Sequence, residues 1–317
     1  MNRRSLLVAG SYNVGMTVVA PDLPRPGETV KGTAFDLGPG GKGANQAIAA
    51  RRLGADVDFL VMLGTDRFGE DARATLTQEG LPPALLLRTD QASTGAALIS
   101  VDAHGRNQIS IAPGANALLR GNHAPDEIVS SAQVLLCQLE CPVEVFTTLA
   151  PAVRAGGGTT VLNPAPAQQL DADILALCDY LIPNEIELAS LTALPTNSDE
   201  QVLVAALQLV ERGATNVIVT LGERGAVLAN REQARHFPSP AVTAMDTTGA
   251  GDAFCAGLAT ALWAGWSVDS AIAHAARAGA FCVTRRGVID GLGRPDDLEA
   301  LPDPGRSTEL AIPALDG

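Results

Sequence analysis

Residues 133–162, QVLLCQLECPVEVFTTLAPAVRAGGGTTVL, contain the pattern that decides the fold. The apolar runs at 133–139 and 159–162 predict buried strands, and the longer stretch at 143–155 between them predicts a helix. The same alternation continues with predicted strands at 180–182 and 216–220 and predicted helices at 185–191 and 199–212. Apolar strands that alternate with helices indicate a mostly parallel sheet covered by helices on both faces, so we expect an α/β fold.

The rest of the chain extends this pattern and adds an exception to it. Further strands are predicted at 5–10 and 57–63, and further helices at 44–53, 66–79, 250–263 and 268–283. Two segments, 12–36 and 94–112, lack crossover helices. The first contains a half-exposed strand pattern at 29–35, and the second contains a hairpin pattern around 102–105. Because no linker divides the sequence, we expect one domain over 1–317 in which these segments form a small antiparallel sheet projecting from the main body.

Composition and charge exclude several classes of protein. Of 317 residues, 46% are apolar and 18% are charged, which is enough for a packed core and rules out disorder of the whole chain. With 22 basic and 35 acidic side chains the net charge is −13, and aromatic residues are only 3%, so we expect no nucleic-acid partner. No apolar run approaches the ~18–20 residues that cross a bilayer, so we expect no membrane partner. The five cysteines include no C-x-x-C pair, which favours free thiols and a cytoplasmic location.

A first glycine-rich stretch, Gly38-Pro39-Gly40-Gly41-Lys42-Gly43, precedes the predicted helix at 44–53. It satisfies the G-x-G-x-x-G fingerprint of nicotinamide-dependent dehydrogenases, but it does not follow the first strand, as that fingerprint requires. It also lacks the Ser or Thr that follows the lysine of a phosphate-binding P-loop. Two interpretations remain: a ligand-binding loop to which Lys42 and Asn45 contribute polar groups, or a tight turn with a solvated lysine.

A second stretch, Asp246-Thr247-Thr248-Gly249-Ala250-Gly251-Asp252, runs directly into the predicted helix at 250–263. The N–H groups at a helix start have no intrahelical acceptor, and the helix dipole adds positive charge, so the Gly-Ala-Gly segment can bind an anion such as a phosphoryl group. Asp252 is the candidate base of a phosphoryl transfer, since a carboxylate here can accept the proton of an attacking hydroxyl. The alternative is a simple helix cap, but a cap does not require two glycines before it.

Two turns beyond strand ends are candidate nucleotide contacts, because ligands of open α/β sheets bind beyond the carboxyl ends of the strands. Thr220-Leu221-Gly222-Glu223-Arg224-Gly225 follows the predicted strand at 216–220 and suits either a nucleotide lying against backbone or a plain hairpin turn. Asn184 follows the strand at 180–182, and Glu187 lies three residues later on the same side of a helix start. A hydrated Mg²⁺ could be reached from there, whereas a helix cap explains Asn184 equally well.

Taken together, these motifs resemble those of the phosphofructokinase-B-type carbohydrate kinase family over residues 5–295, and most closely its ribose-phosphorylating members. The matching stretches are Gly10-Ser11-Tyr12-Asn13, Pro26-Gly27-Glu28-Thr29-Val30, Gly40-Gly41-Lys42-Gly43-Ala44-Asn45-Gln46-Ala47, Asn163-Pro164-Ala165-Pro166, Pro183-Asn184-Glu185, Thr220-Leu221-Gly222 and Asp246-Thr247-Thr248-Gly249-Ala250-Gly251-Asp252. The resemblance implies the fold of that family, in which the small antiparallel sheet is a lid. It also implies ATP-dependent phosphorylation of a sugar, which in those members is D-ribose and becomes D-ribose 5-phosphate.

The resemblance also implies roles for individual residues. Catalysis would use Asp252 with the anion hole of Gly249, Ala250 and Gly251. The sugar site would contain Asn13, Gly15, Gly41, Lys42, Gly43, Asn45, Glu140 and Asp252. The nucleotide would lie near Asn184, Glu187, Thr220, Gly222, Glu223, Gly225 and Gly251, with Mg²⁺ close to Glu187. A monovalent cation, K⁺, would lie near Asp246, Thr248, Cys282, Arg285, Gly287 and Gly291.

Two positions depart from the family pattern. At Gly15 the ribose-phosphorylating relatives have an aspartate, which can accept hydrogen bonds from two sugar hydroxyls, and loss of such a partner can cost ~1–3 kcal/mol. At Gly291 they have a serine near the cation. The alternatives are therefore a kinase of another pentose, of a keto-sugar or of a nucleoside, and a non-catalytic sugar-binding protein. The resemblance further implies a homodimer formed through the lid.

Overall fold

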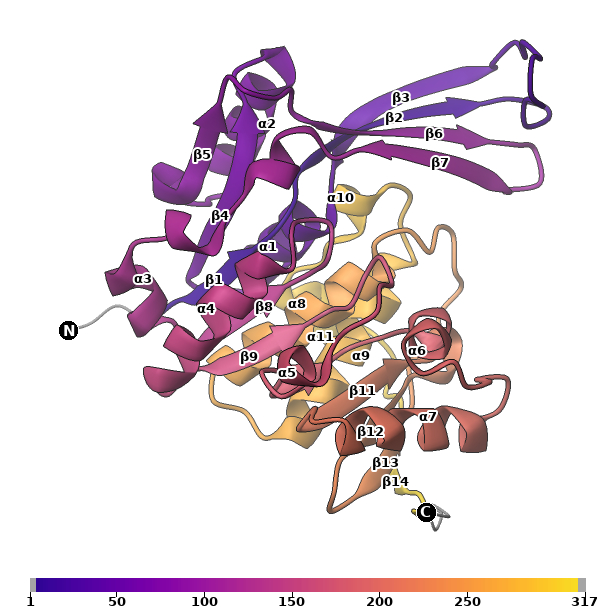
Figure 1. The fold of residues 1–317 in the computed structure, drawn as a ribbon. Helices are drawn as coiled ribbons and strands as arrows, with labels where there is room; N and C mark the ends of the chain where they lie inside the picture. Colours follow the sequence, from indigo (N-terminus) through magenta and orange to yellow (C-terminus); the bar gives the residue numbers. More distant parts are fainter. Residues whose placement is uncertain (1–3, 313–317) are drawn as a thin grey trace.

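The computed structural model describes residues 4–312 and contains one large sheet from which a small sheet projects (Figure 1). The strands of the large sheet are β1 (Leu6–Ala9), β4 (Val57–Gly64), β5 (Leu86–Thr89), β8 (Val134–Cys137), β9 (Thr159–Leu162), β10 (Tyr180–Leu181), β11 (Asn216–Thr220), β12 (Ala226–Ala229), β13 (Ala234–Phe237) and β14 (Thr308–Glu309). Their spatial order is β14-β13-β12-β11-β10-β9-β8-β1-β4-β5. Residues 1–3 and 313–317 of the expected single domain lie outside the described residues.

The large sheet is mostly parallel, as expected. β1 pairs in parallel with β4 and β8, and parallel pairing continues from β8 through β9 and β10 to β11. β12, β13 and β14 add an antiparallel edge. Every residue of β1, β4 and β8 is buried, which is the condition of a parallel sheet covered on both faces. The predicted α/β fold class is therefore confirmed.

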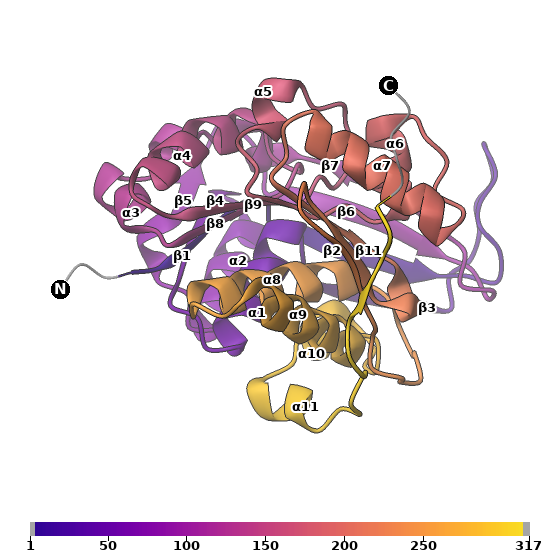
Figure 2. The same ribbon diagram turned by 90° about the horizontal axis from the view of Figure 1, so that it is seen from below.

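Helices cover both faces of the large sheet, and Figure 2 shows the sheet between two helical layers. One layer contains α3 (Asp126–Ser131), α4 (Glu144–Ala155), α5 (Ala172–Leu175), α6 (Glu185–Thr192) and α7 (Asp199–Glu211). The other contains α1 (Lys42–Arg52), α2 (Arg67–Gln78), α8 (Ala250–Trp263), α9 (Val268–Cys282), α10 (Val288–Gly291) and α11 (Pro295–Glu299). Short 3₁₀ turns are η1 (Pro83–Leu85), η2 (Gly114–Leu118), η3 (Gly121–His123) and η4 (Gly222–Arg224). Leu6 and Val8 of β1 enter one core while Leu7 and Ala9 enter the other, because successive side chains of a strand point to opposite faces.

The predicted helices and strands begin and end within two residues of the corresponding observed elements, except in the small sheet. That sheet contains β2 (Asn13–Val19), β3 (Ala34–Gly40), β6 (Gly95–Val101) and β7 (Asn107–Ala112), in the order β3-β2-β6-β7. The predicted hairpin is confirmed as β6 and β7, but the strand predicted at 29–35 is wrong, and β2 was not predicted. β3 begins at Ala34 and continues through the glycines, because pairing with β2 overrides weak strand preference, and proline is tolerated in an edge strand.

The small sheet consists of two antiparallel hairpins joined by a parallel pairing of β2 with β6. One side of it, which we call the apolar face, carries large side chains exposed to solvent: Phe35 (64%), Leu98 (57%), Leu37 (51%) and Val18 (37%). Met16 belongs to the same face, since it lies opposite Leu37 and Leu98 in the strand register. Asn13 and Gly15 lie on the other face, because side chains alternate along β2. That second face also carries the exposed Ile109 and Ile111, but it combines them with polar groups of the site such as Asn13.

Candidate active site

The first turn of α1 lies against the turn that follows β1, and glycine makes this close approach possible. A Cβ atom on Gly43 would lie 2.4 Å from the backbone nitrogen of Ser11, closer than real Cβ atoms come to backbone. Gly41, which precedes the helix, has a φ of 90°, in the left-handed region that favours glycine. Gly41 therefore makes a tight turn from β3 into α1, whereas Gly38, Pro39 and Gly40 belong to β3. The turn also begins a helix that directs Lys42 and Asn45 toward α8.

α8 begins at the second glycine motif. Gly249 precedes it with a φ of 83°, and a Cβ atom on Gly251 would meet nothing within 4 Å. The helix start is therefore open on the side of Gly251, where first-turn N–H groups have no intrahelical acceptor. Of the three residues expected to form the anion hole, Ala250 donates its N–H to the Thr247 carbonyl at 3.3 Å. The arrangement leaves an accessible helix N-terminus next to Asp252.

The Asp252 carboxylate is 6% exposed and is held by two consecutive residues of α1. Asn45 Nδ2 donates to Asp252 Oδ2 at 2.8 Å, and Gln46 Nε2 donates to Asp252 Oδ1 at 3.0 Å. Asn45 Oδ1 is buried and has no hydrogen-bond partner within residues 4–312. Buried polar atoms are normally paired, so this oxygen is an acceptor available to a hydroxyl of a bound ligand.

Glu140 accepts hydrogen bonds from several polar groups at the other end of the site. Its Oε2 accepts hydrogen bonds from Ser11 Oγ at 2.5 Å, from the Lys42 backbone N–H at 2.9 Å and from Asn13 Nδ2 at 3.3 Å. Asn13 Oδ1 in turn accepts from Asn116 Nδ2 at 2.9 Å. The sequence did not single out Ser11 or Asn116, because these contacts join segments that are far apart in the chain. The structure brings together Asn13, Lys42, Asn45, Glu140 and Asp252 from the expected sugar site.

Lys42 lies within electrostatic reach of Asp252, Glu140 and Glu187. Burial lowers the pKa of its ammonium group, but attraction to these carboxylates outweighs burial and raises the pKa overall. Burial also raises the pKa of Glu187, although the Asn184 N–H and the charge of Lys42 oppose that shift. Of the two interpretations, the one with a solvated lysine does not hold: Lys42 is a partly buried cation that can stabilise an anionic group.

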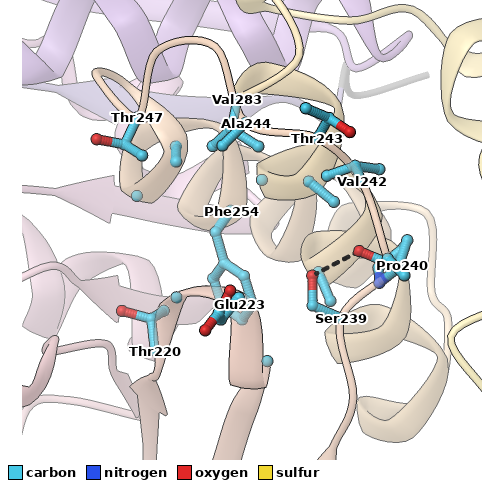
Figure 3. A pocket seen from close by; sticks show the side chains of 18 residues that line it. Thr220, Glu223, Ser239, Pro240, Val242, Thr243, Ala244, Thr247, Phe254 and Val283 are labelled. Carbon is cyan, nitrogen blue, oxygen red and sulfur yellow. Dashed lines mark hydrogen bonds between the residues drawn. The ribbon is translucent and has the colours of Figure 1, made fainter.

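A cavity of about 840 Å³ opens beside the start of α8, within the size range of small-molecule sites (Figure 3). It is lined by Thr220, Gly222, Glu223, Gly225 and Gly251 from the expected nucleotide site, and by Ala250. Figure 3 shows Thr220 and Glu223 across the cavity from Val242 and Thr243. The remaining walls, the segment 239–244 and one side of α9, were not predicted. The α9 wall has a visible signal in the sequence, since Ala276, Gly279, Ala280 and Val283 follow helical i, i+3, i+4, i+7 spacing.

The turn at 220–225 is a hairpin turn, and Asn184 with Glu187 forms a helix cap, which are the simpler of the structures considered for them. β11 and β12 form an antiparallel hairpin around residues 220–225, although the same turn lines the cavity. Asn184 Oδ1 accepts from the Glu187 N–H at 2.8 Å, and Glu187 Oε2 accepts from the Asn184 N–H at 2.9 Å, which is a capping box. Neither residue lines the cavity, but Asn184 forms an isolated parallel bridge with Thr220.

Most residues of the expected cation site also come together. Asp246 Oδ1 accepts from the Thr248 N–H at 2.9 Å, and its Oδ2 accepts from the Gly287 N–H at 3.1 Å. Burial opposes ionisation of Asp246, but these hydrogen bonds lower its pKa overall. The Cys282 thiol donates to the Thr248 carbonyl at 3.5 Å, and a Cβ atom on Gly291 would lie 2.9 Å from the Cys282 carbonyl oxygen. Separately from this cluster, the Arg285 guanidinium lies over the Phe281 ring, 5.3 Å from its centroid.

The sequence pattern of the pfkB family carbohydrate kinases matches residues 3–294. Ribokinase of Haemophilus influenzae is 36% identical over 307 residues, which cover 94% of this chain and 99% of that relative. Deoxyribokinase of Salmonella typhi is 36% identical over 289 residues, which cover 89% of this chain and 93% of that relative.

Solved structures agree with these sequence matches. The ribokinase of Thermotoga maritima superposes with a TM-score of 0.86 at 33% identity, covering 94% of this chain and 99% of that one. The Arabidopsis thaliana ribokinase, complexed with ribose and ATP, gives a TM-score of 0.86 at 31% identity, covering 94% of this chain and 98% of that one. The fold is thus that of a carbohydrate kinase. This chain belongs to the pfkB family, which confirms the resemblance stated from the motifs.

Replacing Asp252 with alanine tests its role directly. Because the buried carboxylate held at the open start of α8 is then lost, we expect kcat to fall by about 10²–10⁴-fold, the range typical of a lost general base. Nucleotide binding, measured by calorimetry, should persist, because the cavity walls are unchanged. A coupled assay of ADP release measures the turnover. A rate close to that of the wild-type protein would exclude Asp252 as the base.

Proposed function

We propose that this protein transfers the γ-phosphoryl group of ATP to the 5-hydroxyl of D-ribose and releases D-ribose 5-phosphate and ADP. The observation that supports this most directly is Asp252, a buried carboxylate held by two amides at an open helix start beside a cavity. Relatives that align with nearly the whole chain are named ribokinase, and one solved relative is complexed with ribose and ATP.

In the proposed reaction, the sugar binds at the polar end of the site and ATP occupies the cavity. Asn13, Asn45 and Glu140 supply hydrogen-bonding groups to the sugar hydroxyls. As the bond from the sugar oxygen to the γ-phosphorus forms and the bond to the ADP oxygen breaks, Asp252 accepts the hydroxyl proton. The first-turn N–H groups of α8 and the Lys42 ammonium stabilise the negative charge on the transferring group.

We further propose that Mg²⁺ accompanies the nucleotide near Glu187. Among the described residues, no group of three or more His, Cys, Asp or Glu side chains could hold a metal ion. Such a cage is not needed for Mg²⁺, which usually keeps several waters and binds through one or two carboxylates and the substrate phosphates. The capping box uses one oxygen of Glu187 and orients the carboxylate.

A K⁺ site near Asp246 is also part of the proposal. The oxygen ligands available there are the Asp246 carboxylate and the main-chain carbonyls of Thr248 and Cys282. Carbonyl oxygens are the ligands that replace the hydration shell of K⁺ in proteins, so these oxygen ligands fit the ion. When bound, the ion would add positive charge beside the anion hole at the start of α8.

A kinase of another pentose is the second candidate, and Gly15 favours it. Gly15 lies two residues beyond Asn13 on the same face of β2, so it borders the proposed sugar site without offering a side chain. A Cβ atom there would have only the Gly38 carbonyl oxygen within 4 Å, at 3.5 Å, so no neighbour fills the space. A deoxyribokinase is as similar to this chain as the first ribokinase named above.

We also propose a homodimer in which the apolar faces of two small sheets pack together. Phe35, Leu37 and Leu98 are each more than half exposed on that face. Contiguous apolar patches of this kind mark interaction surfaces, because burying them from water is favourable. The lid of the proposed enzyme would then also be its dimer contact.

A cytoplasmic location is proposed from the cysteines. Cys137, Cys141, Cys178, Cys255 and Cys282 are all buried and unpaired. Free thiols are typical of proteins in reducing compartments. In the part of the chain that the structure describes, no helix has the length and apolar character needed to span a membrane.

The proposed function is tested by a panel of sugars with MgATP. We expect ADP release with D-ribose, formation of D-ribose 5-phosphate, and a faster rate in K⁺ than in Na⁺ because of the carbonyl-lined site. A coupled assay measures ADP, and mass spectrometry identifies the product. Turnover of 2-deoxyribose or another sugar without turnover of D-ribose would favour the second candidate. No turnover of any sugar would favour the non-catalytic alternative.

A substitution at position 15 tests the sugar specificity. Gly15→Asp adds the missing acceptor to the sugar site, so we expect the KM for D-ribose to fall by about 5–150-fold, equivalent to ~1–3 kcal/mol. The control Gly15→Ala fills the same space but adds no acceptor, so its KM should stay near that of the wild-type protein. Initial-rate kinetics measure both. An unchanged KM in Gly15→Asp would show that this position does not face the sugar.

Charge on the apolar face tests the dimer. Leu37→Glu combined with Leu98→Glu places two charges in the proposed contact, so we expect the protein to sediment as a monomer. The control Ile109→Glu adds a charge at a residue that is 54% exposed on the opposite face, and it should leave the dimer intact. Sedimentation equilibrium measures the mass. A wild-type monomer, or a dimer that survives the double substitution, would contradict the proposed contact.

A further inference from the structure

Gln46 is completely buried, and both ends of its amide group are occupied. Its Nε2 donates to Asp252 Oδ1 at 3.0 Å and to Asn163 Oδ1 at 3.2 Å, and its Oε1 accepts from Gln138 Nε2 at 2.5 Å. Since Gln46 has no exposed surface, its side chain cannot contact a sugar or a nucleotide. Its contact with the proposed catalytic machinery is the hydrogen bond to Asp252.

A backbone carbonyl fixes the orientation of every amide in this cluster. Asn163 Nδ2 donates to the Ile182 carbonyl oxygen at 2.9 Å, and a carbonyl can only accept, so Asn163 Oδ1 must face Gln46. Gln46 must then present its NH₂ group to Asn163, and the same NH₂ group reaches Asp252. Gln138 donates to the remaining oxygen of Gln46. The cluster therefore has one consistent arrangement, in which the NH₂ group of Gln46 is directed toward the carboxylate.

The cluster connects Asp252 to the centre of the large sheet. Gln138 lies just beyond the end of β8, Asn163 follows β9 directly, and Ile182 follows β10 directly. These three strands are adjacent and parallel, and their ends are buried. The carboxylate on α8 is thus tied through α1 to the carboxyl ends of neighbouring strands. Such a support is rigid, because its members are locked by packing and by hydrogen bonds.

The two donors to Asp252 differ in what else they do. Asn45 retains an unpartnered buried oxygen, so it can also bind a ligand hydroxyl and change its contacts when a sugar enters. Gln46 is saturated by protein groups and is separated from the ligand. One donor is therefore shared with the substrate, while the other is not.

We propose that Gln46 is a positioning residue for the catalytic base: it fixes the rotation of the Asp252 carboxylate while Asn45 engages the sugar. With Gln46 in place, Oδ1 remains bonded to a rigid donor and Oδ2 is directed to the site. Without it, the carboxylate loses one of its two N–H donors and can rotate away from the attacking hydroxyl. This inference rests on the proposed role of Asp252 as the base.

Several other charged or titratable groups face Asp252. They are Lys42 on α1, Glu187 on α6, Cys255 on α8 and Cys282 on α9. Burial raises the pKa of both thiols, so these remain neutral near neutral pH. None of the four changes in the variants below, so a change in the pH profile reports on the hydrogen bond to Asp252.

The test compares Gln46→Met with a matched control, Gln138→Met. Methionine keeps the volume and the unbranched shape of glutamine but removes the amide. We expect Gln46→Met to lower kcat by about 10–100-fold through misplacement of the base, with a sugar Kd within about threefold of the wild-type value. Loss of an N–H donor should also shift the acid limb of the kcat–pH profile, where kcat falls as the pH is lowered, to higher pH. Gln138→Met also loses a buried amide, but that amide is bonded to Gln46 and not to Asp252, so both donors to Asp252 stay in place.

Both variants lose buried hydrogen bonds, so both should unfold at lower temperature. Only Gln46→Met should change kcat and the acid limb. An equal loss of kcat in both variants, with an unchanged acid limb, would show that the cluster merely stabilises the fold and would overturn the proposal. The assay uses whichever sugar of the panel the wild-type protein phosphorylates fastest. A substrate other than D-ribose would then contradict the proposed function without affecting this comparison.

Gln46→Glu provides a second measurement in case the methionine variant does not fold. The introduced carboxyl group keeps the shape of glutamine, and in its protonated form it can still donate to Asp252. Once ionised, it can only accept and repels the neighbouring carboxylate. We therefore expect the activity of this variant, relative to the wild-type protein, to fall as pH rises. A constant ratio across the pH range would also overturn the proposal.

Discussion

The structure depends on the distance between α1 and the turn that follows β1. Backbone meets backbone there: the Ala44 N–H donates to the Ser11 carbonyl at 2.8 Å, and Gly43 has no room for a Cβ atom. At this distance the side chains of Asn45 and Gln46 reach the carboxylate on α8. A helix pushed outward by a single methyl group would lose both hydrogen bonds. Gly41 and Gly43 of the first motif are therefore required by packing before any ligand is considered, whereas a Cβ atom at Gly38 would meet nothing within 4 Å.

The two halves of the site use different kinds of recognition. The half proposed to bind the sugar is built from polar groups that converge on Glu140 and Asp252 from distant parts of the chain. The nucleotide half is lined by small and apolar side chains, by the turn 220–225 and by the open start of α8. In the proposed enzyme, specificity for the sugar would therefore depend on a few replaceable side chains, whereas the nucleotide would be selected by the shape of the cavity and by backbone groups.

The sequence predicted those parts of the molecule that have local signals. Strand and helix alternation follows from apolar periodicity, and the start of α8 follows from a continuous motif, so both were found. β2 was missed and β3 was displaced, because glycine and proline have weak strand preference and only pairing between distant segments selects these strands. Glu140 was identified through family resemblance, and Ser11 and Asn116 were not singled out at all. Their roles arise from contacts across the fold, which no local pattern encodes.

The two departures from the family pattern have different physical consequences. A Cβ atom at Gly291 would lie 3.0 Å from the Cys282 Sγ, so side chains at these two positions compete for the same space. The thiol fills that space and donates to the Thr248 carbonyl. Burial and the nearby Asp252 and Asp246 raise its pKa to about 12, so it adds no charge beside the proposed K⁺ site.

Nothing comparable fills the space at Gly15, where an added Cβ would have only the Gly38 carbonyl oxygen within 4 Å. The glycine at position 291 therefore leaves room for the Cys282 thiol, so the packing around Thr248 is preserved. The change at position 15 instead removes a side chain from the proposed sugar site and leaves open space there.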